Sequence, residues 1–416
     1  MTAARVNNSE FAAPEIVSTI HQRSLGVGII FGVASLIAAI LPGTREQFFH
    51  SYLIGYMLWL GITLGSMAIL MINHMTGGAW GMVIRRQLEA AVKTLPFMAL
   101  LFIPIILGMQ HLYTGSHEAG AGWSGWLNPD PKDGHLVMMS RTYLTATGYI
   151  ARAIIYFAVW IIVGFALVRK SAQQDNPPVE NLSPRFRRIA APGLILYAFT
   201  ITFAVIDWVM SLDPHWISTI YGFIFIAGEL LSAISIMVVI ETIMSNYEPM
   251  ASLLKAKEVQ DHGKLMLTFT MLWAYFSFSQ LLIIWAGNLP MEIRFFTRRL
   301  NSGWQEIGLI LVIFHFFVPF FMLLSRSFKR NPHQLAWLAG FMILMRLVDL
   351  FFYIEPNFHK SVLGGIAGYW LDLVVPIAIG GLWMALFFRN LRSRPLLPAY
   401  DLHAQEFLEY AGAAHE

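Results

Sequence analysis

The sequence has no cysteine and few charged residues for its length. Without thiols, the chain can form no disulfide, ligate no iron–sulfur cluster through thiolates and attach no c-type haem covalently. Any such redox centre would therefore belong to a partner subunit. No nucleic-acid partner is indicated either, because the formal net charge of the 416 residues is only +3.

Apolar residues are abundant instead. They make up 56% of the chain against 13% charged residues, and the mean hydropathy is +0.58. A soluble domain cannot bury so much apolar surface, so the bilayer is the natural solvent. Ten apolar runs are long enough to cross about 30 Å of hydrocarbon. We therefore predict an all-α, polytopic membrane protein with ten spans over residues 24–41, 51–73, 94–113, 142–168, 189–212, 217–244, 265–287, 304–325, 335–354 and 366–391.

The basic residues predict the orientation of these spans. An even number of spans places both termini on one side, and 19 of the 28 Lys and Arg residues fall in the tails and loops of that side. By the positive-inside rule both termini are then cytoplasmic. We expect a cytoplasmic tail over residues 1–23 that is not a signal peptide, a membrane domain over 24–391 and a second cytoplasmic tail over 392–416.

The connecting segments are short except for residues 114–141. This loop is rich in Gly and Pro and contains Trp123 and Trp126. It is either a plain connector anchored by interfacial tryptophans or a docking surface for a partner outside the cytoplasm, and the sequence favours neither. Segments 78–93 and 245–264 are predicted to form short interfacial helices on the cytoplasmic side.

Ionisable residues recur inside the predicted spans. A charge at mid-bilayer costs about 2.5–3.5 kcal/mol on insertion scales, so such residues usually face a bundle interior or a wet cavity. Protons can pass along side chains placed in this way. The candidates for a proton path are Asp207, Glu229, Glu241, His315, Arg346, Asp349 and Asp372.

The spacing of these residues suggests how they are grouped. Arg346 and Asp349 stand three residues apart on one helical face, which fits an ion pair or a role with protons or a ligand. Asp207, Glu229 and Glu241 belong to two consecutive spans and are expected to share one region at graded depths. Glu229 and Glu241 are about 18 Å apart along their helix, so water and hydroxyls would have to fill the gap. Alternatively, the buried acids only hydrogen-bond neighbouring helices.

Two of the candidates precede a proline by four residues. His315 is followed by Pro319 and Asp372 by Pro376. A helical proline donates no hydrogen bond to the carbonyl at i−4, so the backbone carbonyl of each candidate is left without its usual donor. In hydrocarbon such a carbonyl needs water or a side chain, and we predict local hydration at both places.

No motif for catalysis or for metal binding is recognised. A b-type haem needs paired histidines at matching depth on facing helices. His74, His111 and His315 fall at three different depths, so none of them is predicted to bind haem.

Four segments, 51–96, 101–113, 204–222 and 276–296, resemble the ActF-type membrane subunit of bacterial alternative complex III, in the NrfD/polysulfide-reductase family. That complex is a quinol:cytochrome c or quinol:electron acceptor oxidoreductase. The resemblance implies two four-helix bundles, about 51–212 and 217–354, with two flanking helices, in the bacterial cytoplasmic membrane among lipids. It also implies several partners: a multihaem cytochrome c with haem c, a large subunit with iron–sulfur clusters, a paralogous NrfD-like subunit and small membrane subunits.

The resemblance also bears on the role of the chain. Leu64 stands where the sibling subunit has a histidine, which argues against quinol oxidation by this chain. The resemblance implies instead a non-catalytic subunit that scaffolds the complex and conducts protons along its buried acids. The alternative is direct oxidation of a quinol, such as menaquinol, in an outward-facing pocket beside His111, Asp207 or Asp372. A secondary transporter is a further alternative, for which inverted repeats with broken helices would be needed.

Overall fold

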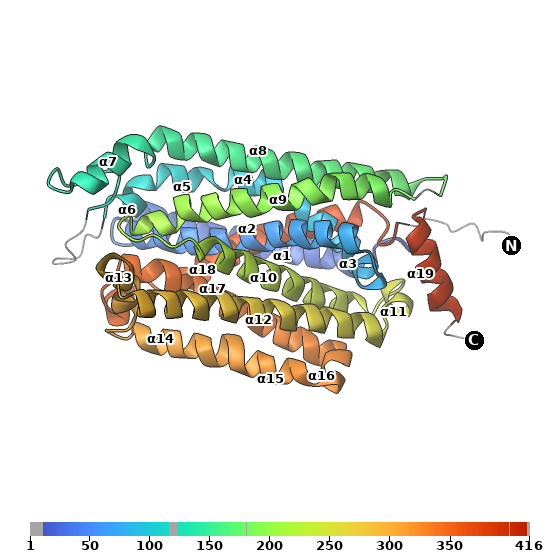
Figure 1. The fold of residues 1–416 in the computed structure, drawn as a ribbon. Helices are drawn as coiled ribbons and strands as arrows, with labels where there is room; N and C mark the ends of the chain where they lie inside the picture. The colour runs from blue at the N-terminus through green and yellow to red at the C-terminus, as the bar shows by residue number, and fades with distance from the viewer. Residues whose placement is uncertain (1–10, 116–123, 180, 399, 414–416) are drawn as a thin grey trace.

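The computed structural model describes residues 11–115, 124–179, 181–398 and 400–413, and most of these residues are helical (Figure 1). No β-strand occurs in this part of the chain. The long helices lie side by side along the long axis of the molecule (Figure 1). The α-helices are α1 (Ile16–Ile40), α2 (Arg45–Thr76), α3 (Ala79–Val92), α4 (Leu95–Leu100), α5 (Ile103–Leu107), α6 (Met109–Tyr113), α7 (Gly134–Thr142), α8 (Ala146–Ser171), α9 (Ser183–Trp208), α10 (Tyr221–Met244), α11 (Met250–Leu253), α12 (Ala256–Gly287), α13 (Pro290–Arg299), α14 (Trp304–Ile310), α15 (Val318–Leu324), α16 (Arg326–Arg330), α17 (Pro332–Ile354), α18 (Leu371–Arg392) and α19 (Leu402–Ala413).

Ten helical segments are long and apolar enough to cross a membrane, which confirms the predicted all-α, polytopic fold. Five of them extend beyond a single α-helix, because they include a 3-10 turn, a π-helical turn or a neighbouring short α-helix. The ten segments are Ile16–Ile40, Arg45–Thr76, Ala79–Leu107, Ala146–Asp175, Ser183–Leu212, Tyr221–Met244, Ala256–Gly287, Trp304–Leu324, Pro332–Asn357 and Leu371–Arg392.

Several of the predicted segment boundaries were wrong, because hydropathy detects only the apolar part of a helix. Helix α1 begins at Ile16, inside the predicted tail 1–23, and α12 begins at Ala256, inside the predicted interfacial segment 245–264. Polar residues extend these helices beyond the apolar run. Segment 78–93 does contain a helix, α3, which is buried against α2 and α18 and begins the long apolar segment Ala79–Leu107.

The membrane helices pack as two groups joined along one interface. Helices α2, α4–α6, α8 and α9 contact one another, and so do α10, α12, α14–α15 and α17. Helices α2 and α10 connect the two groups. The most apolar stretches of α2 and α10 are 94% and 83% buried, against 17% for α1, so α2 and α10 are the central helices. Buried polar residues on these two helices can therefore meet residues from both groups.

The flanking helices α1 and α18 pack tightly against each other and along α2. A Cβ atom at Gly381 of α18 would overlap the backbone of Gly28 of α1. Such a close backbone approach is common between membrane helices, where packing replaces the hydrophobic effect. The two ends of the membrane domain are therefore joined on the same flank.

The predicted third span, 94–113, is divided into the short helices α4, α5 and α6. Pro104 is the second residue of α5 and has no backbone N–H to donate to the preceding turn. Two tyrosines of α2 supply donors in this region, since Tyr52 donates to the carbonyl of Leu101 at 2.7 Å and Tyr56 to that of Met98 at 3.0 Å. This irregular backbone is thus satisfied from within the protein, as a membrane requires.

The described ends of the chain meet at one end of the bundle. The backbone N–H of Leu396 donates to the carbonyl of Phe11 at 2.7 Å, and α19 lies at the same end (Figure 1). We call this the terminal end, and the other the opposite end.

At the opposite end, Trp126 does not anchor the loop 114–141 at a membrane interface, as the interpretation of this loop as a plain connector required. It is 1% exposed and packs on Tyr113 and Tyr149, with ring centroids 5.1 and 5.8 Å away. Trp123 lies outside the described residues. The sequence could not show this because burial of Trp126 depends on helices α6 and α8.

Candidate functional site

All seven predicted proton-path residues are buried in the protein. Their exposed fractions range from 0% for Asp207, Glu241 and His315 to 6% for Asp372. None is turned toward lipid, in keeping with the high cost of a charge in hydrocarbon. The structure does not join the seven into one group, however. They belong to four polar clusters at different places in the bundle: that of Asp207, that of Glu229 with Arg346, Asp349 and His315, that of Glu241, and that of Asp372.

Asp207 belongs to an ion pair near the opposite end. Arg152 of α8 donates from Nε to Oδ2 at 2.8 Å and from Nη2 to Oδ1 at 2.9 Å. Tyr156 also donates to Oδ2, at 2.8 Å, and the guanidinium lies 4.0 Å from the ring centroid of Tyr143. Both carboxylate oxygens of Asp207 are therefore occupied. The expectation that Asp207 shares one region with Glu229 and Glu241 was wrong, because each acid faces a different neighbouring helix.

Glu229 lies at the interface of the two helix groups. Tyr197 of α9 donates to its Oε2 at 2.7 Å. The side chain of Glu229 packs closely on Gly61 of α2: a Cβ atom added at Gly61 would lie only 3.1 Å from Cγ of Glu229. The guanidinium of Arg346, from α17, packs against the neighbouring Gly228. Helices α2, α9, α10 and α17 thus enclose this one carboxylate at the centre of the protein.

The predicted pair of Arg346 and Asp349 is confirmed as a buried ion pair between Nη1 and Oδ2. Trp273 of α12 also donates to Oδ2 of Asp349, at 3.2 Å. His315 packs on this tryptophan with ring centroids 4.2 Å apart. Neither ring nitrogen of His315 has a hydrogen bond of ordinary geometry among the described residues.

His315 also lies in an irregular stretch of helix. Residues Leu311–Phe317 form a π-helix directly before Pro319. Such π-helical turns occur frequently at functional sites because they leave backbone groups without their usual partners. This is in line with the predicted hydration beside His315, which remains a prediction.

Glu241 contacts a histidine on the side of the terminal end. Its Oε1 lies 2.8 Å from Nδ1 of His262, and Nε2 of this histidine lies 2.8 Å from the carbonyl of Trp80. The Glu241–His262 pair is fully buried. It connects α10 and α12 with the start of α3. The sequence interpretation did not include His262, although it stands only three residues before the predicted seventh span.

Asp372 belongs to the fourth cluster, at the opposite end. Ser51 of α2 donates to Oδ1 of Asp372 at 2.5 Å. The side-chain amide of Gln47 donates to Oε1 of Glu355 at 3.0 Å and to both oxygens of Asp372 at 3.4 Å. The predictions missed Glu355 because it stands one residue beyond the predicted end of the ninth span. It is fully buried, so it forms part of the polar interior.

The three residues considered for a quinol pocket do not come together. His111 stacks on Phe49 of α2 with ring centroids 4.8 Å apart, whereas Asp372 contacts Ser51 of the same helix. Positions 49 and 51 point about 160° apart around an α-helix, toward nearly opposite faces. Asp207 is held separately by Arg152 on α8. One pocket lined by His111, Asp207 and Asp372 is therefore not formed.

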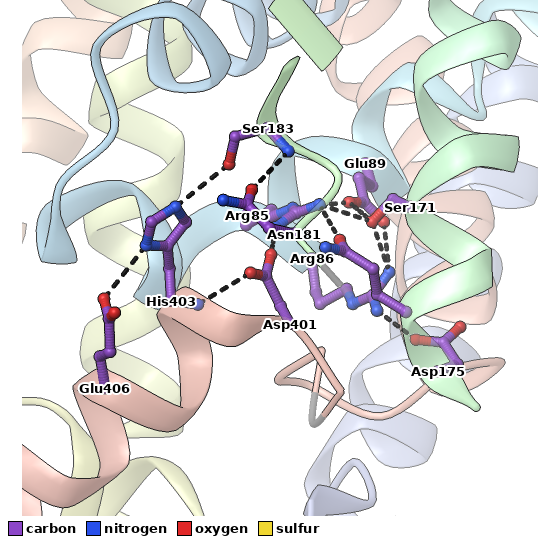
Figure 2. A network of polar contacts seen from close by, with 11 residues as sticks. Arg85, Arg86, Glu89, Ser171, Asp175, Asn181, Ser183, Asp401, His403 and Glu406 are labelled. Carbon is purple, nitrogen blue, oxygen red and sulfur yellow. Dashed lines mark hydrogen bonds and ion pairs between the residues drawn. The ribbon is translucent and has the colours of Figure 1, made fainter. Parts of the chain in front are cut away.

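A network of charged residues at the terminal end holds the C-terminal segment in place (Figure 2). Arg85 donates to Oδ2 of Asp401 at 2.6 Å. Arg86 pairs with Glu89 at 2.7 Å and with Asp175. Both arginines are only 3% exposed. The positive-inside rule explains why basic residues gather on one side, but it does not distinguish these buried, paired arginines from solvated ones.

Comparison with known proteins assigns no family: no family model matches the chain, and no curated protein matches it either. What the chain does must therefore be inferred from its buried polar residues and from the arrangement of its helices.

Proposed function

We propose that the chain is an integral membrane subunit of an alternative complex III, a quinol:electron acceptor oxidoreductase, in which it scaffolds the assembly and conducts protons. Residues 51–96, 101–113, 204–222 and 276–296 support the proposal by their resemblance to the ActF-type subunit. The observation on which the proton role rests is the environment of Glu229. This carboxylate is buried where four helices of both groups meet.

A carboxylate at such a place is costly unless it is used or firmly paired. Asp207 is firmly paired, because Arg152 occupies both of its oxygens, and we assign it a structural role. Glu229 has one neutral donor, the hydroxyl of Tyr197, which leaves its other oxygen available to a proton or to water. We therefore place Glu229 at the centre of the proposed path.

The other buried clusters extend the path in both directions. Glu241 and His262 lie on the side of the terminal end, and Asp372 and Glu355 lie at the opposite end. Glu229 and Glu241 are about 18 Å apart along α10, so water molecules must complete this section. Ser232 does not fill the gap, because its hydroxyl donates to the carbonyl of Gly228 in its own helix.

The proposal includes the surroundings of the chain. Haem c and iron–sulfur clusters would belong to a multihaem cytochrome c subunit and a large iron–sulfur subunit, since this chain has no cysteine to hold them. A paralogous NrfD-like subunit, small membrane subunits and lipid would complete the complex, and menaquinol or another quinol would be oxidised elsewhere in it. The membrane would be the bacterial cytoplasmic membrane, with both termini in the cytoplasm.

Two experiments test the proposal. Gentle affinity purification of the chain, followed by haem staining and subunit mass spectrometry, should recover a cytochrome c and an iron–sulfur protein. Recovery of the polypeptide alone would contradict membership of the complex. In proteoliposomes of the intact complex, Glu229→Gln should lower the number of protons translocated per electron.

Asp261→Asn is the control for the second experiment. Asp261 lies on α12 and pairs with Lys264 at the surface, where both side chains are accessible to solvent. This variant should leave proton translocation unchanged. If Glu229→Gln also leaves the stoichiometry unchanged while the complex stays intact, Glu229 does not conduct protons.

A further inference from the structure

Two histidines and a glutamate meet at the opposite end of the bundle, beside the Asp372 cluster. One potential ligand atom from each of His50, Glu355 and His359 lies within 4.8 Å of those of the other two. His50 comes from α2, and the other two residues come from the turn that follows α17. Nothing in the sequence motifs predicted this group, because 305 residues separate His50 from Glu355.

The local geometry favours a shared ligand. Glu355 and His359 are four residues apart, and the backbone N–H of His359 donates to the carbonyl of Glu355 at 3.1 Å, as in one turn of helix. This spacing places two side chains on one face, as in helical metal sites. The ring of His50 is held by stacking on Phe358, with centroids 3.5 Å apart and planes 11° from parallel.

Glu355 has one oxygen held and one directed into the group. Its Oε1 accepts from the amide of Gln47 at 3.0 Å. Its Oε2 lies 3.6 Å from Nε2 of His359, too far for a hydrogen bond, and has no hydrogen-bond partner among the described residues. An orphaned oxygen of a fully buried carboxylate is costly. A cation at this position would satisfy it.

We propose that His50, Glu355 and His359 bind a divalent transition-metal ion, and that zinc matches this donor set best. Two imidazole nitrogens and one carboxylate oxygen form a ligand set found in zinc sites that keep a fourth position open. Tetrahedral zinc with bonds of about 2.1 Å places its ligand atoms about 3.4 Å apart. The side chains need to move closer by no more than about 1.4 Å, which rotamer adjustments can supply.

Gln47 serves as the supporting residue and as a candidate fourth donor. Its Oε1 accepts a hydrogen bond from Nε2 of His359 at 3.1 Å. A bound zinc ion would replace this hydrogen bond, and 3.1 Å is close to the separation between two ligands of one zinc ion. Its amide nitrogen remains bound to Glu355 and Asp372, so its orientation is fixed from the other side. The side chain of His359 is 18% exposed, which leaves an entry path for the ion from the loop region.

Zinc titration tests the site independently of any proton or redox role. The purified chain is treated with a chelator, dialysed and titrated with zinc chloride in a calorimeter. One equivalent of zinc should bind, and His50→Ala, Glu355→Gln and His359→Ala should each weaken binding about tenfold or more. His333→Ala, at an exposed position near the start of α17, is the matched control and should bind like the unmodified chain.

X-ray absorption spectroscopy of the zinc-loaded, unmodified chain needs no variant and therefore does not depend on variant folding. It should show two imidazole ligands with additional oxygen donors. Failure of the unmodified chain to bind zinc, or zinc bound without imidazole, overturns the proposal. Equal affinity in the unmodified chain and in a folded His50→Ala/His359→Ala variant, with folding checked by gel filtration, also overturns it.

Discussion

Arg152 and Asp207 form a bidentate ion pair between α8 and α9, with N–O distances of 2.8 and 2.9 Å. Asp207 is completely buried, whereas the side chain of Arg152 is 20% exposed. Two parallel hydrogen bonds between a guanidinium and a carboxylate give both strength and orientation. The pair therefore fixes the relative positions of two helices near the opposite end, and it explains an acid within a long apolar run.

Removing one partner of this pair should destabilise the protein. Arg152→Met leaves Asp207 buried without its cation, and breaking such a buried pair costs about 3–5 kcal/mol. A clear fall in the thermal unfolding midpoint in detergent is expected. The double variant Arg152→Met/Asp207→Leu should recover most of the loss, because an apolar pair of similar size restores packing. Equal midpoints for the single variant and the unmodified chain would show that the pair contributes nothing.

The contact between α2 and α10 should be intolerant of added volume. A Cβ atom at Gly65 would overlap the backbone carbonyl of Glu229, a group that cannot move without shifting α10. Gly65→Ala should therefore destabilise the protein by about 1–3 kcal/mol or more in detergent unfolding. Gly32→Ala is the control, since a Cβ atom there meets nothing within 4 Å. A neutral effect of Gly65→Ala would mean that the helices are not so closely packed.

Asp401 should hold α19 against the rest of the protein. Its carboxylate accepts from buried Arg85 at 2.6 Å, and Asp401→Asn removes the charge from this contact (Figure 2). Faster hydrogen exchange is expected across α19, with no change in the membrane helices. Glu406→Gln is the control, because Glu406 is exposed and contacts only His403 among the labelled neighbours (Figure 2). Unchanged exchange in α19 after Asp401→Asn would contradict this role.

The start of α7 should be sensitive to acid. The pKa of Asp133 is lowered by a hydrogen bond from the backbone N–H of Leu136, at the N-terminus of α7, and further by His215, whose Nε2 lies 2.5 Å from Oδ2. A carboxylate with a lowered pKa stabilises the folded state above its ordinary pKa, about 3.9. This contribution is lost as the pH falls through the lower, folded-state value.

A spin label can detect this change, because the chain has no cysteine that would also react. A label at Met138→Cys, an exposed position on α7, should become more mobile as the pH is lowered through 4 and below. Asp133→Asn is the matched control. Asparagine still caps the helix but does not titrate, so label mobility should then change little over this range. Equal pH dependence of label mobility with Asp133 and with Asp133→Asn would contradict the prediction.

The sequence by itself determined the class of fold and the burial of the charged residues. The length of an apolar run identifies a membrane helix because the hydrocarbon layer has a fixed thickness. The cost of a charge in lipid predicts that Glu229 and Asp372 face the protein interior. The local pairing of Arg346 with Asp349 also followed from sequence, because a spacing of three residues fixes their relation within one helix.

Only the tertiary structure decided which helices supply the side chains that pair with the buried ionisable residues. Arg152 meets Asp207 across 55 residues, Ser51 meets Asp372 across 321, and His50 approaches Glu355 across 305. Hydropathy states that a residue is buried, but not toward which neighbour it points. That choice depends on how the helices rotate and cross when they pack, and it follows from the fit of many side chains at once.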